Sequence, residues 1–292
     1  MSHATEHLDP GTGKATTGHE WDGIAELNTP LPRWWLWTFY ATILWAIGYW
    51  IVYPAWPLLS SATEGAFGWN TRRAVEQDIA ELKTLRGPML TKLASVSAKD
   101  IEQSPELLAI ARPLGAAAFA ANCAACHGTG AQGAKGYPNL NDDEWLWGGS
   151  LDDIQKTITH GVRWDADPET RTSQMPAFGR DGILKPSEIS AVADYVRSLS
   201  GLSVEKTADL AKGHELFAAN CALCHGEDGK GNREFGAPNL ADQIWLYGSD
   251  KASIVQRINL GGGGVMPAWG TRLDPVTIKA LTVYVYTLGG GQ

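Results

Sequence analysis

The chain has 292 residues, 44% of them hydrophobic, which is enough for roughly two domains of about 150 residues each. Its formal net charge of −8 argues against nucleic acid as a partner, because phosphate binding needs basic patches. An acidic surface is compatible with the docking of a basic protein.

The N-terminal part contains a polar tail and an apolar stretch. Residues 1–33 are polar and show no hydrophobic periodicity, which predicts a mostly disordered tail. The next stretch has no charged side chain up to Leu59, and residues 34–53 are about as many as a membrane-spanning helix needs. Aromatic residues cluster at both ends of this stretch, as in a spanning helix, and Pro54 follows it. We therefore predict a transmembrane anchor at residues 34–56.

A cleaved signal peptide is the alternative interpretation of this apolar stretch. Signal peptides have an apolar region of about 7–15 residues and a cleavage site with small residues. The stretch here is longer, is rich in Trp and follows a 33-residue tail, so an uncleaved anchor is favoured. Basic residues lie on both sides of it, so the positive-inside rule does not decide its orientation.

Residues 57–110 form a linker that contains a predicted amphipathic helix. Val75, Ile79 and Leu82 have helical spacing within residues 71–97. Gly87-Pro88 is expected to kink or break this helix, since proline removes a backbone donor.

All four cysteines of the chain belong to two Cys-x-x-Cys-His motifs. The motifs consist of Cys123, Cys126 and His127, and of Cys221, Cys224 and His225. This pattern is typical of c-type haem, in which both thiols bond to the haem vinyl groups and the histidine ligates the iron. Two covalently bound haem c groups are therefore predicted.

Three other uses of these cysteines are possible. A disulfide within each pair could form in an oxidising compartment. A thioredoxin-like redox motif is less compatible, because no βαβ pattern surrounds either pair. A zinc site would need further Cys or His ligands nearby, and neither motif has them. The recurrence of the full motif, with no cysteine left over, favours haem.

The remainder of the chain is an internal duplication, with copies at residues 111–202 and 203–292. The first copy is longer before its methionine, and residues 165–172 are the predicted insertion. Each copy ends in a helix that begins at a proline, at residues 186–199 and 275–288. The matching positions are Gly115 and Gly213, Phe119 and Phe217, Pro138 and Pro238, Trp145 and Trp245, Trp147 and Tyr247, Met175 and Met266, and Tyr195 and Tyr284.

These matched residues suggest structural roles. Gly and Phe four residues apart share one helix face, and glycine lets the terminal helix with its tyrosine approach closely. An axial histidine usually donates its second ring N–H to a fixed acceptor, and the carbonyls of Pro138 and Pro238 are the candidates. Trp145, Trp147, Trp245 and Tyr247 are candidates for contacts with haem propionates or for simple packing against the haem.

The N-terminal region also carries a family resemblance. The stretches Asp22-Gly23-Ile24-x-Glu26 and Asn28-Thr-Pro-Leu-Pro32, followed by the apolar helix and the duplication, resemble the CcoP/FixP family. These proteins are the dihaem cytochrome c subunits of cbb3-type cytochrome c oxidase. The resemblance implies a mainly α fold, with one N-terminal transmembrane helix followed by two tandem class I cytochrome c domains.

The resemblance also implies the axial ligands. His127 and Met175 would ligate the first iron, and His225 and Met266 the second. A methionine ligand raises the reduction potential relative to bis-histidine ligation. His160 is an alternative to Met175. The other methionines, Met1 and Met89, lie outside the repeats.

The family further implies a place in a proton-translocating terminal oxidase of the respiratory chain. The subunit would accept electrons from a donor cytochrome c and pass them through a monohaem cytochrome c subunit to a haem–copper catalytic subunit. The chain itself would contain no oxygen-reducing site and no catalytic residue. Bacterial c-type haems are attached outside the cytoplasmic membrane, so residues 1–33 would be cytoplasmic and the haem domains periplasmic. A free-standing tethered dihaem carrier and a dihaem peroxidase are the alternatives; the peroxidase would need an open iron site.

Overall fold

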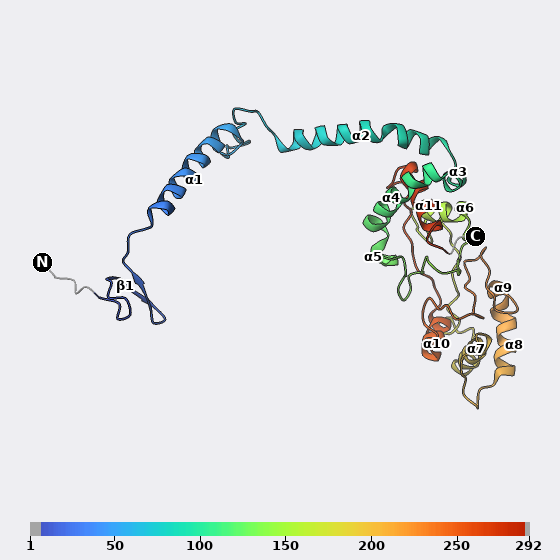
Figure 1. Cartoon of the computed structure of the whole chain (residues 1–292). Helices are drawn as coiled ribbons and strands as arrows, with labels where there is room; N and C mark the ends of the chain where they lie inside the picture. The colour runs from blue at the N-terminus through green and yellow to red at the C-terminus, as the bar shows by residue number, and fades with distance from the viewer. Residues whose placement is uncertain (1–6, 290–292) are drawn as a thin grey trace. The chain divides into compact units, whose positions relative to one another are not determined.

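The computed structural model describes residues 7–289, which form two compact units, one up to Leu85 and one from Arg86 onward. The chain is mainly helical (Figure 1). Each unit is described by itself below.

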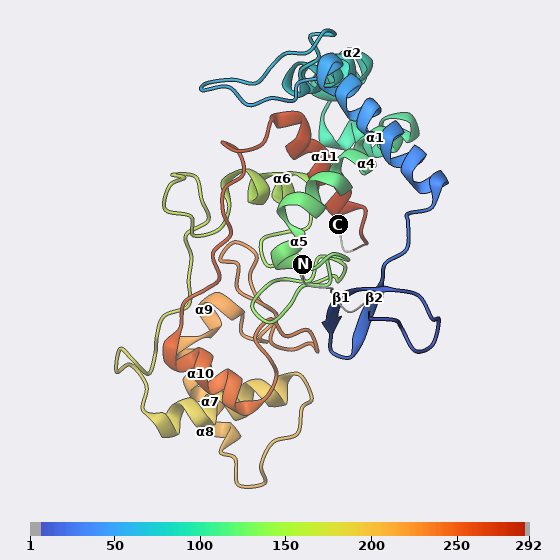
Figure 2. The ribbon, with the colours of Figure 1, turned by 90° about the vertical axis from the view of Figure 1, so that its left-hand side faces the viewer.

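The tail before the anchor contains a β-hairpin, so the prediction of a mostly disordered tail is wrong for this segment. Strands β1 (Thr16–Trp21) and β2 (Ile24–Leu27) pair antiparallel (Figure 2). Asp22 and Gly23 connect them with φ of 50° and 83°. Asp-Gly is a preferred pair for the two-residue turn with positive φ at both positions, because that turn matches the twist of the strands.

Helix α1 (Arg33–Val52) is the predicted anchor. Its 20 residues, at about 1.5 Å each, give a length of about 30 Å, which matches the hydrocarbon core of a bilayer. Its mean hydropathy is 1.3 and none of its residues is buried. Within the described part of the chain it is the one helix long and apolar enough to cross a membrane. The helix ends at Tyr53, whose extended backbone suits the residue before a proline.

Helix α2 (Thr71–Ser95) begins in the first unit and ends in the second. It continues through Pro88, so the break considered at Gly87-Pro88 does not occur. Its C-terminal end is held within the second unit. Leu93 is 1% exposed, and Lys279 Nζ donates to the carbonyls of Leu93, Ala94 and Val96 at 3.0, 2.8 and 2.6 Å. A cation there also complements the helix dipole.

The second unit is built from short helices of the two sequence copies. The first copy supplies α4 (Pro105–Asn122), α5 (Ala124–His127), α6 (Leu151–His160) and α7 (Pro186–Leu199), preceded by α3 (Ala98–Gln103). The second copy supplies α8 (Leu210–Asn220), α9 (Ala222–His225), α10 (Lys251–Leu260) and α11 (Pro275–Tyr286).

The terminal helices of the two copies are exchanged in space. Helix α11 packs on α4 and α6 of the first copy, and α7 packs on α8 and α10 of the second (Figures 1 and 2). A Cβ on Gly115 would lie 2.3 Å from the carbonyl oxygen of Ala280, and one on Gly213 would lie 2.4 Å from that of Ala191. The glycines therefore accept terminal helices, as the sequence suggested, but each from the other copy.

The loops before the terminal helices are exchanged as well. Val162 and Met266 bond to each other in both directions at 2.9 Å. Reciprocally, Met175 N–H donates to Gly262 at 3.3 Å, and Gly262 N–H donates to Met175 at 2.7 Å. Each Cys-x-x-Cys-His motif is therefore surrounded by helices and loops from both copies.

Candidate haem-binding sites

Each Cys-x-x-Cys-His motif follows a long helix and forms a short helix of its own. Cys123 ends α4 and begins α5, and Cys221 does the same between α8 and α9. Both cysteines have nearly the same backbone conformation, with φ of −113° and −118° and ψ of −33° and −31°. The two motifs thus present their thiols and imidazoles in the same local geometry.

The two histidines are oriented by proline carbonyls, as predicted. His127 Nδ1 lies 2.9 Å from the carbonyl oxygen of Pro138, and His225 Nδ1 lies 3.0 Å from that of Pro238. A carbonyl only accepts, so each Nδ1 carries the proton and each Nε2 keeps its lone pair for a metal. Burial lowers the pKa of both rings, which favours the neutral imidazole that a metal requires.

No disulfide joins any of the four cysteines. Burial raises the pKa of Cys123 and of Cys221 to about 11. A thioredoxin-like motif needs a lowered thiol pKa, so this environment contradicts that alternative. The histidines and thiols instead fit covalent attachment of a haem.

The methionines lie with the opposite motifs. Met266 packs against the apolar cluster that also holds Cys123 and Phe119. Met175 packs against the cluster that holds Cys221 and Phe217. The pairing implied by the resemblance, His127 with Met175 and His225 with Met266, therefore differs from this arrangement. The physical reason is the loop exchange, which carries each methionine to the other copy.

His160 is occupied by carboxylates. Its Nδ1 lies 3.2 Å from both carboxylate oxygens of Asp167, and its Nε2 lies 3.5 Å from Glu169. Both acids belong to the insertion at residues 165–172. Because both ring nitrogens have partners, this arrangement speaks against His160 as an alternative to Met175.

The buried indoles of Trp145 and Trp245 indicate whether the surroundings of each motif suit a haem. Trp145 Nε1 and Trp245 Nε1 are buried, and neither has a hydrogen-bond partner among the described residues. A buried donor without an acceptor costs roughly 1–3 kcal/mol, so an acceptor is expected at these positions. Haem propionates would supply one beside each motif, since Trp145 packs in the Cys123 cluster and Trp245 in the Cys221 cluster. The residues present thus fit the haem.

Trp147 and Tyr247, the other two aromatic candidates, lie against guanidinium groups. Arg171 lies over the Trp147 ring at 5.1 Å, and Arg257 lies over the Tyr247 ring at 3.5 Å. These are cation–π distances. The basic partners could not be identified from the sequence, because they are far from the aromatic residues along the chain.

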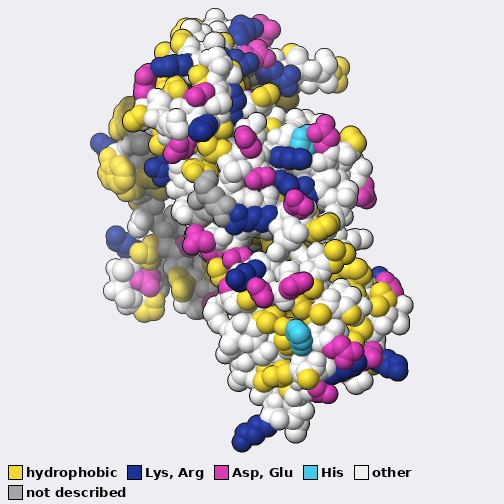
Figure 3. Space-filling view, turned by 90° about the vertical axis from the view of Figure 1, so that its right-hand side faces the viewer, with side chains coloured by type: hydrophobic (Ala, Val, Ile, Leu, Met, Phe, Trp, Pro, Cys, Tyr) yellow, Lys and Arg dark blue, Asp and Glu magenta, His cyan; other side chains and the backbone are white. Residues whose placement is uncertain are grey.

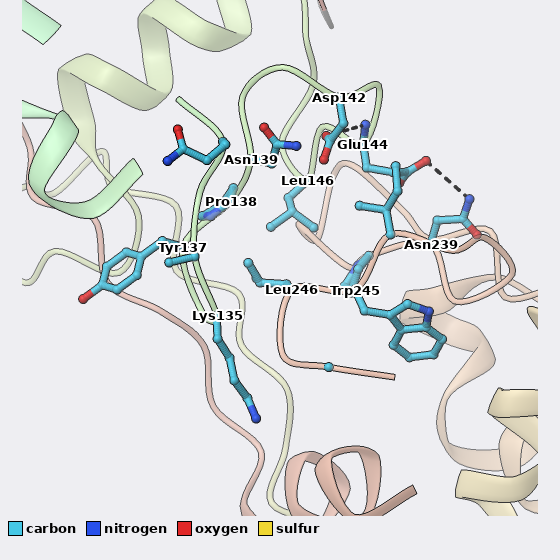
Figure 4. Close-up of a pocket in the computed structure, with 15 residues that line it drawn as sticks. Lys135, Tyr137, Pro138, Asn139, Asp142, Glu144, Leu146, Asn239, Trp245 and Leu246 are labelled. Carbon is cyan, nitrogen blue, oxygen red and sulfur yellow. Dashed lines mark hydrogen bonds between the residues drawn. The ribbon is translucent and has the colours of Figure 1, made fainter. Parts of the chain in front are cut away.

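A cavity of about 310 Å³ lies between the two copies (Figure 4). Side chains and backbone from two stretches line it, within residues 132–146 and 238–248, and Pro138 and Pro238 are among them. The carbonyls that orient the two histidines therefore belong to residues bordering one cavity. Sequence reasoning did not predict this shared lining, because a repeat shows that there are two copies but not how they contact each other in space.

Carboxylate side chains also line this cavity. Glu144 Oε1 lies 3.5 Å from Asn239 Nδ2 across the cavity (Figure 4). Burial first, and the Asp242 carboxylate second, raise the pKa of Glu144. Burial also raises the pKa of Asp142. Two of the acidic residues at positions 142–144 are thus half-buried, and Asp143 is exposed.

Comparison with known families accounts for most of the chain. Residues 13–60 match the family described as the N-terminal domain of cytochrome oxidase-cbb3, FixP. Residues 113–200 match cytochrome c, and residues 208–285 match cytochrome C oxidase, cbb3-type, subunit III.

Curated relatives match over almost their full lengths. The cbb3-type cytochrome c oxidase subunit FixP of Azorhizobium caulinodans is 63% identical to this chain. The alignment covers all of this chain and 99% of that subunit. The FixP subunit of a Bradyrhizobium species is 60% identical, with 98% of each chain covered. The CcoP subunit of Cereibacter sphaeroides is 50% identical, with 95% of each chain covered.

Proposed function

Because the chain belongs to the FixP/CcoP family of cbb3-type cytochrome c oxidase subunits, we propose that it is the subunit at which electrons reach that oxidase. As a member, it is a membrane-anchored cytochrome c component of an oxidoreductase complex. Beyond family membership, we propose that the chain carries two haem c groups, that its electron donor is a cytochrome c, and that electrons flow from this donor to the oxidase. The observation that carries it is the duplicated motif with two proline-oriented imidazoles.

The proposed haem-binding residues come from both copies at each site. Cys123 and Cys126 would hold the first haem covalently, and Cys221 and Cys224 the second. His127 and His225 would be axial ligands through Nε2. The packing supports Met266 as the second ligand beside His127, and Met175 beside His225. When bound, the haems supply reversible one-electron transfer.

The surrounding residues orient the haems and exclude water. Pro138 and Pro238 fix the imidazole planes, and Trp145 and Trp245 offer N–H groups to propionates. Phe119 and Phe217, 2% and 1% exposed, help to seal the apolar clusters. An apolar, water-excluding surrounding limits reorganisation during electron transfer and tunes the reduction potential.

The proposed partners follow from the membrane anchor and from the lack of oxygen-reducing ligands in it. Helix α1 contains no histidine, so oxygen reduction is assigned to a haem–copper subunit, reached through a monohaem cytochrome c subunit. The haem-bearing unit would be periplasmic and residues 1–33 cytoplasmic, in the bacterial inner membrane. Residues 114–292 carry 20 acidic and 15 basic side chains, which favours a basic donor cytochrome c.

Purification of the full chain from membranes tests this proposal against its alternatives. We expect it to co-purify with large haem–copper subunits and to show two c haems per chain in the pyridine haemochrome spectrum. Isolation of the dihaem chain alone would favour a free-standing carrier. Peroxide turnover by the isolated chain would favour a peroxidase, which the methionine beside each site opposes.

A further inference from the structure

The fold-back loop, residues 53–69, lies between α1 and α2 and returns to the end of α1 (Figure 1). Ala66 N–H donates to the carbonyl of Ile51 at 2.8 Å, and Phe67 N–H donates to that of Val52 at 3.3 Å. These carbonyls belong to the last turn of α1, where no later helical residue can bond them. The loop therefore caps the end of the anchor with its own backbone.

A glycine makes this return possible. Gly65 has a φ of 73°, and a Cβ at this position would lie 2.4 Å from the carbonyl oxygen of Val52. Backbone conformation and space thus both exclude a side chain there. Within the loop, Thr63 N–H donates to the carbonyl of Trp56 at 2.9 Å, and the Thr63 hydroxyl accepts from Trp56 N–H at 3.1 Å. The loop is thus a compact structure with backbone hydrogen bonds of its own.

The outward surface of the fold-back loop is apolar. Leu59 is completely exposed, and Leu58, Trp56 and Phe67 are 58%, 54% and 72% exposed. Leu58 and Leu59 lie at the tip of a turn that is closed by the bond from Leu58 N–H to the carbonyl of Ser61 at 2.7 Å. Contiguous exposed apolar side chains of this kind mark an interaction surface.

The surroundings of the loop favour the lipid bilayer as its partner. No charged side chain lies at residues 34–63, and Glu64 is the one charged residue of the loop. Tyr53 joins the loop to the anchor: its ring centroid lies 4.8 Å from that of Tyr49 in α1 and 5.9 Å from that of Trp69 in the loop. Such aromatic clusters are typical of the membrane–water interface. The internal backbone hydrogen bonds lower the cost of bringing the loop into that interface.

We propose that the fold-back loop lies in the membrane interface on the side to which α2 leads, with Leu58 and Leu59 inserted among the lipid chains. The anchor then has a broad apolar base at one end. This base resists displacement of α1 along the membrane normal and keeps the start of α2 at the membrane surface. The proposal requires no haem and is therefore independent of the proposed function.

Spin labels on single introduced cysteines test the position of the loop. The full chain with labelled Leu59→Cys is reconstituted into phosphatidylcholine vesicles. Relative to a water-soluble nickel chelate, oxygen should collide several-fold more often with this label than with one at Gln77→Cys, on the exposed surface of α2. Leu44→Cys, exposed in the middle of α1, marks the lipid interior. Equal access of the nickel chelate at residues 59 and 77 would place the loop in water and overturn the proposal.

The same label in the assembled oxidase identifies what covers the loop. If lipid covers it, the label at residue 59 keeps its preference for oxygen. If the label is shielded from both reagents, a partner subunit covers the loop, and the assignment to the bilayer is overturned. The wild-type chain should take up no label, because its four cysteines would be bonded to haem. Labelling of the wild-type chain would count against the proposed function alone.

Gly65→Ala tests whether the end of α1 holds the loop in place. Combined with Leu59→Cys, it should raise the access of the nickel chelate to the label, because the added methyl group separates the loop from α1. Gly68→Ala is the matched control: Gly68 also has a positive φ, of 55°, but a Cβ there meets nothing within 4 Å. In this control the label should keep its preference for oxygen. Unchanged access in Gly65→Ala would contradict the fold-back arrangement on which the proposal rests.

Discussion

The imidazole rings of His127 and His225 are each held by a hydrogen bond to a proline carbonyl. Their acceptors were predictable, because proline is a rigid residue at a matching position in both copies. The unpaired indoles were only half predictable: the sequence marked four aromatic candidates, and burial separates Trp145 and Trp245 from the other two. The partners of Trp147 and Tyr247 depend on tertiary contacts that no local pattern encodes.

Glu144 provides a prediction about pH. Burial and Asp242 raise its pKa in the folded chain above the unfolded value of about 4.3, so the folded state binds more protons in the range above pH 4.3. Stability is therefore lost as the pH rises through this range. Glu144→Gln should raise the melting temperature at pH 7 and weaken its dependence on pH, as measured by circular dichroism of the full chain in detergent. Asp143→Asn, at an exposed neighbour, is the control. A less stable Glu144→Gln variant would mean that the carboxylate makes a net favourable contact.

Asp194 and Lys251 provide a prediction about stability. Asp194 is 6% exposed and accepts from Lys251 Nζ at 2.7 Å, which ties α7 to α10 of the other copy. Lys251→Met should destabilise the fold by about 2–3 kcal/mol, below the 3–5 kcal/mol of a fully buried pair because Lys251 is 31% exposed. Denaturant unfolding measures this change. Adding Asp194→Val, which matches Val283 of α11, should restore most of the stability; an additive loss would refute the pairing.

At the scale of helices and strands, two features differ from the sequence interpretation. The hairpin at residues 16–27 was missed although Asp22-Gly23 is a recognised turn signal, because residues 16–20 before the turn are polar or Gly and no alternation of apolar residues stands out. The exchange of α7 and α11 could not be predicted. Tyr195-Val196 and Tyr284-Val285 are equivalent in sequence, so either terminal helix fits either glycine.

Gly115 tests the contact between α4 and α11. A Cβ there would lie 2.3 Å from the Ala280 carbonyl oxygen, so Gly115→Ala must push two helices apart and should cost about 1–3 kcal/mol. Gly87→Ala is the matched control in α2, where a Cβ meets nothing within 4 Å and should stabilise the helix by up to about 1 kcal/mol. Thermal unfolding compares the two. Equal effects would show that α11 does not pack on Gly115.

For the whole molecule, net charge predicted less about function than the internal duplication did. The haem-bearing residues are net negative, yet on the face shown in Figure 3 acidic and basic side chains are interspersed. On that face, steering of a donor would therefore depend on individual exposed residues rather than on a patch of one sign.

The exchange predicts how the chain can be divided. Residues 57–292 contain both copies and should form a soluble dihaem protein when exported with a cleavable signal. When residues 57–202 and 203–292 are expressed separately, each fragment lacks the terminal helix that packs on it in the full chain. Each fragment should therefore retain little haem. Haem staining of the fragments measures this. Two stable halves that each carry a haem would show that each copy folds independently.

The assignment of each methionine to the histidine of the other copy is tested most directly in a chain with one haem. Cys221→Ala with Cys224→Ala leaves the first haem alone, and its ferric spectrum should keep the weak red charge-transfer band of iron–methionine ligation. In that background, Met266→Leu should abolish the band and Met175→Leu should leave it intact. Loss of the band in Met175→Leu, with its retention in Met266→Leu, would contradict the exchange and restore ligation within each copy.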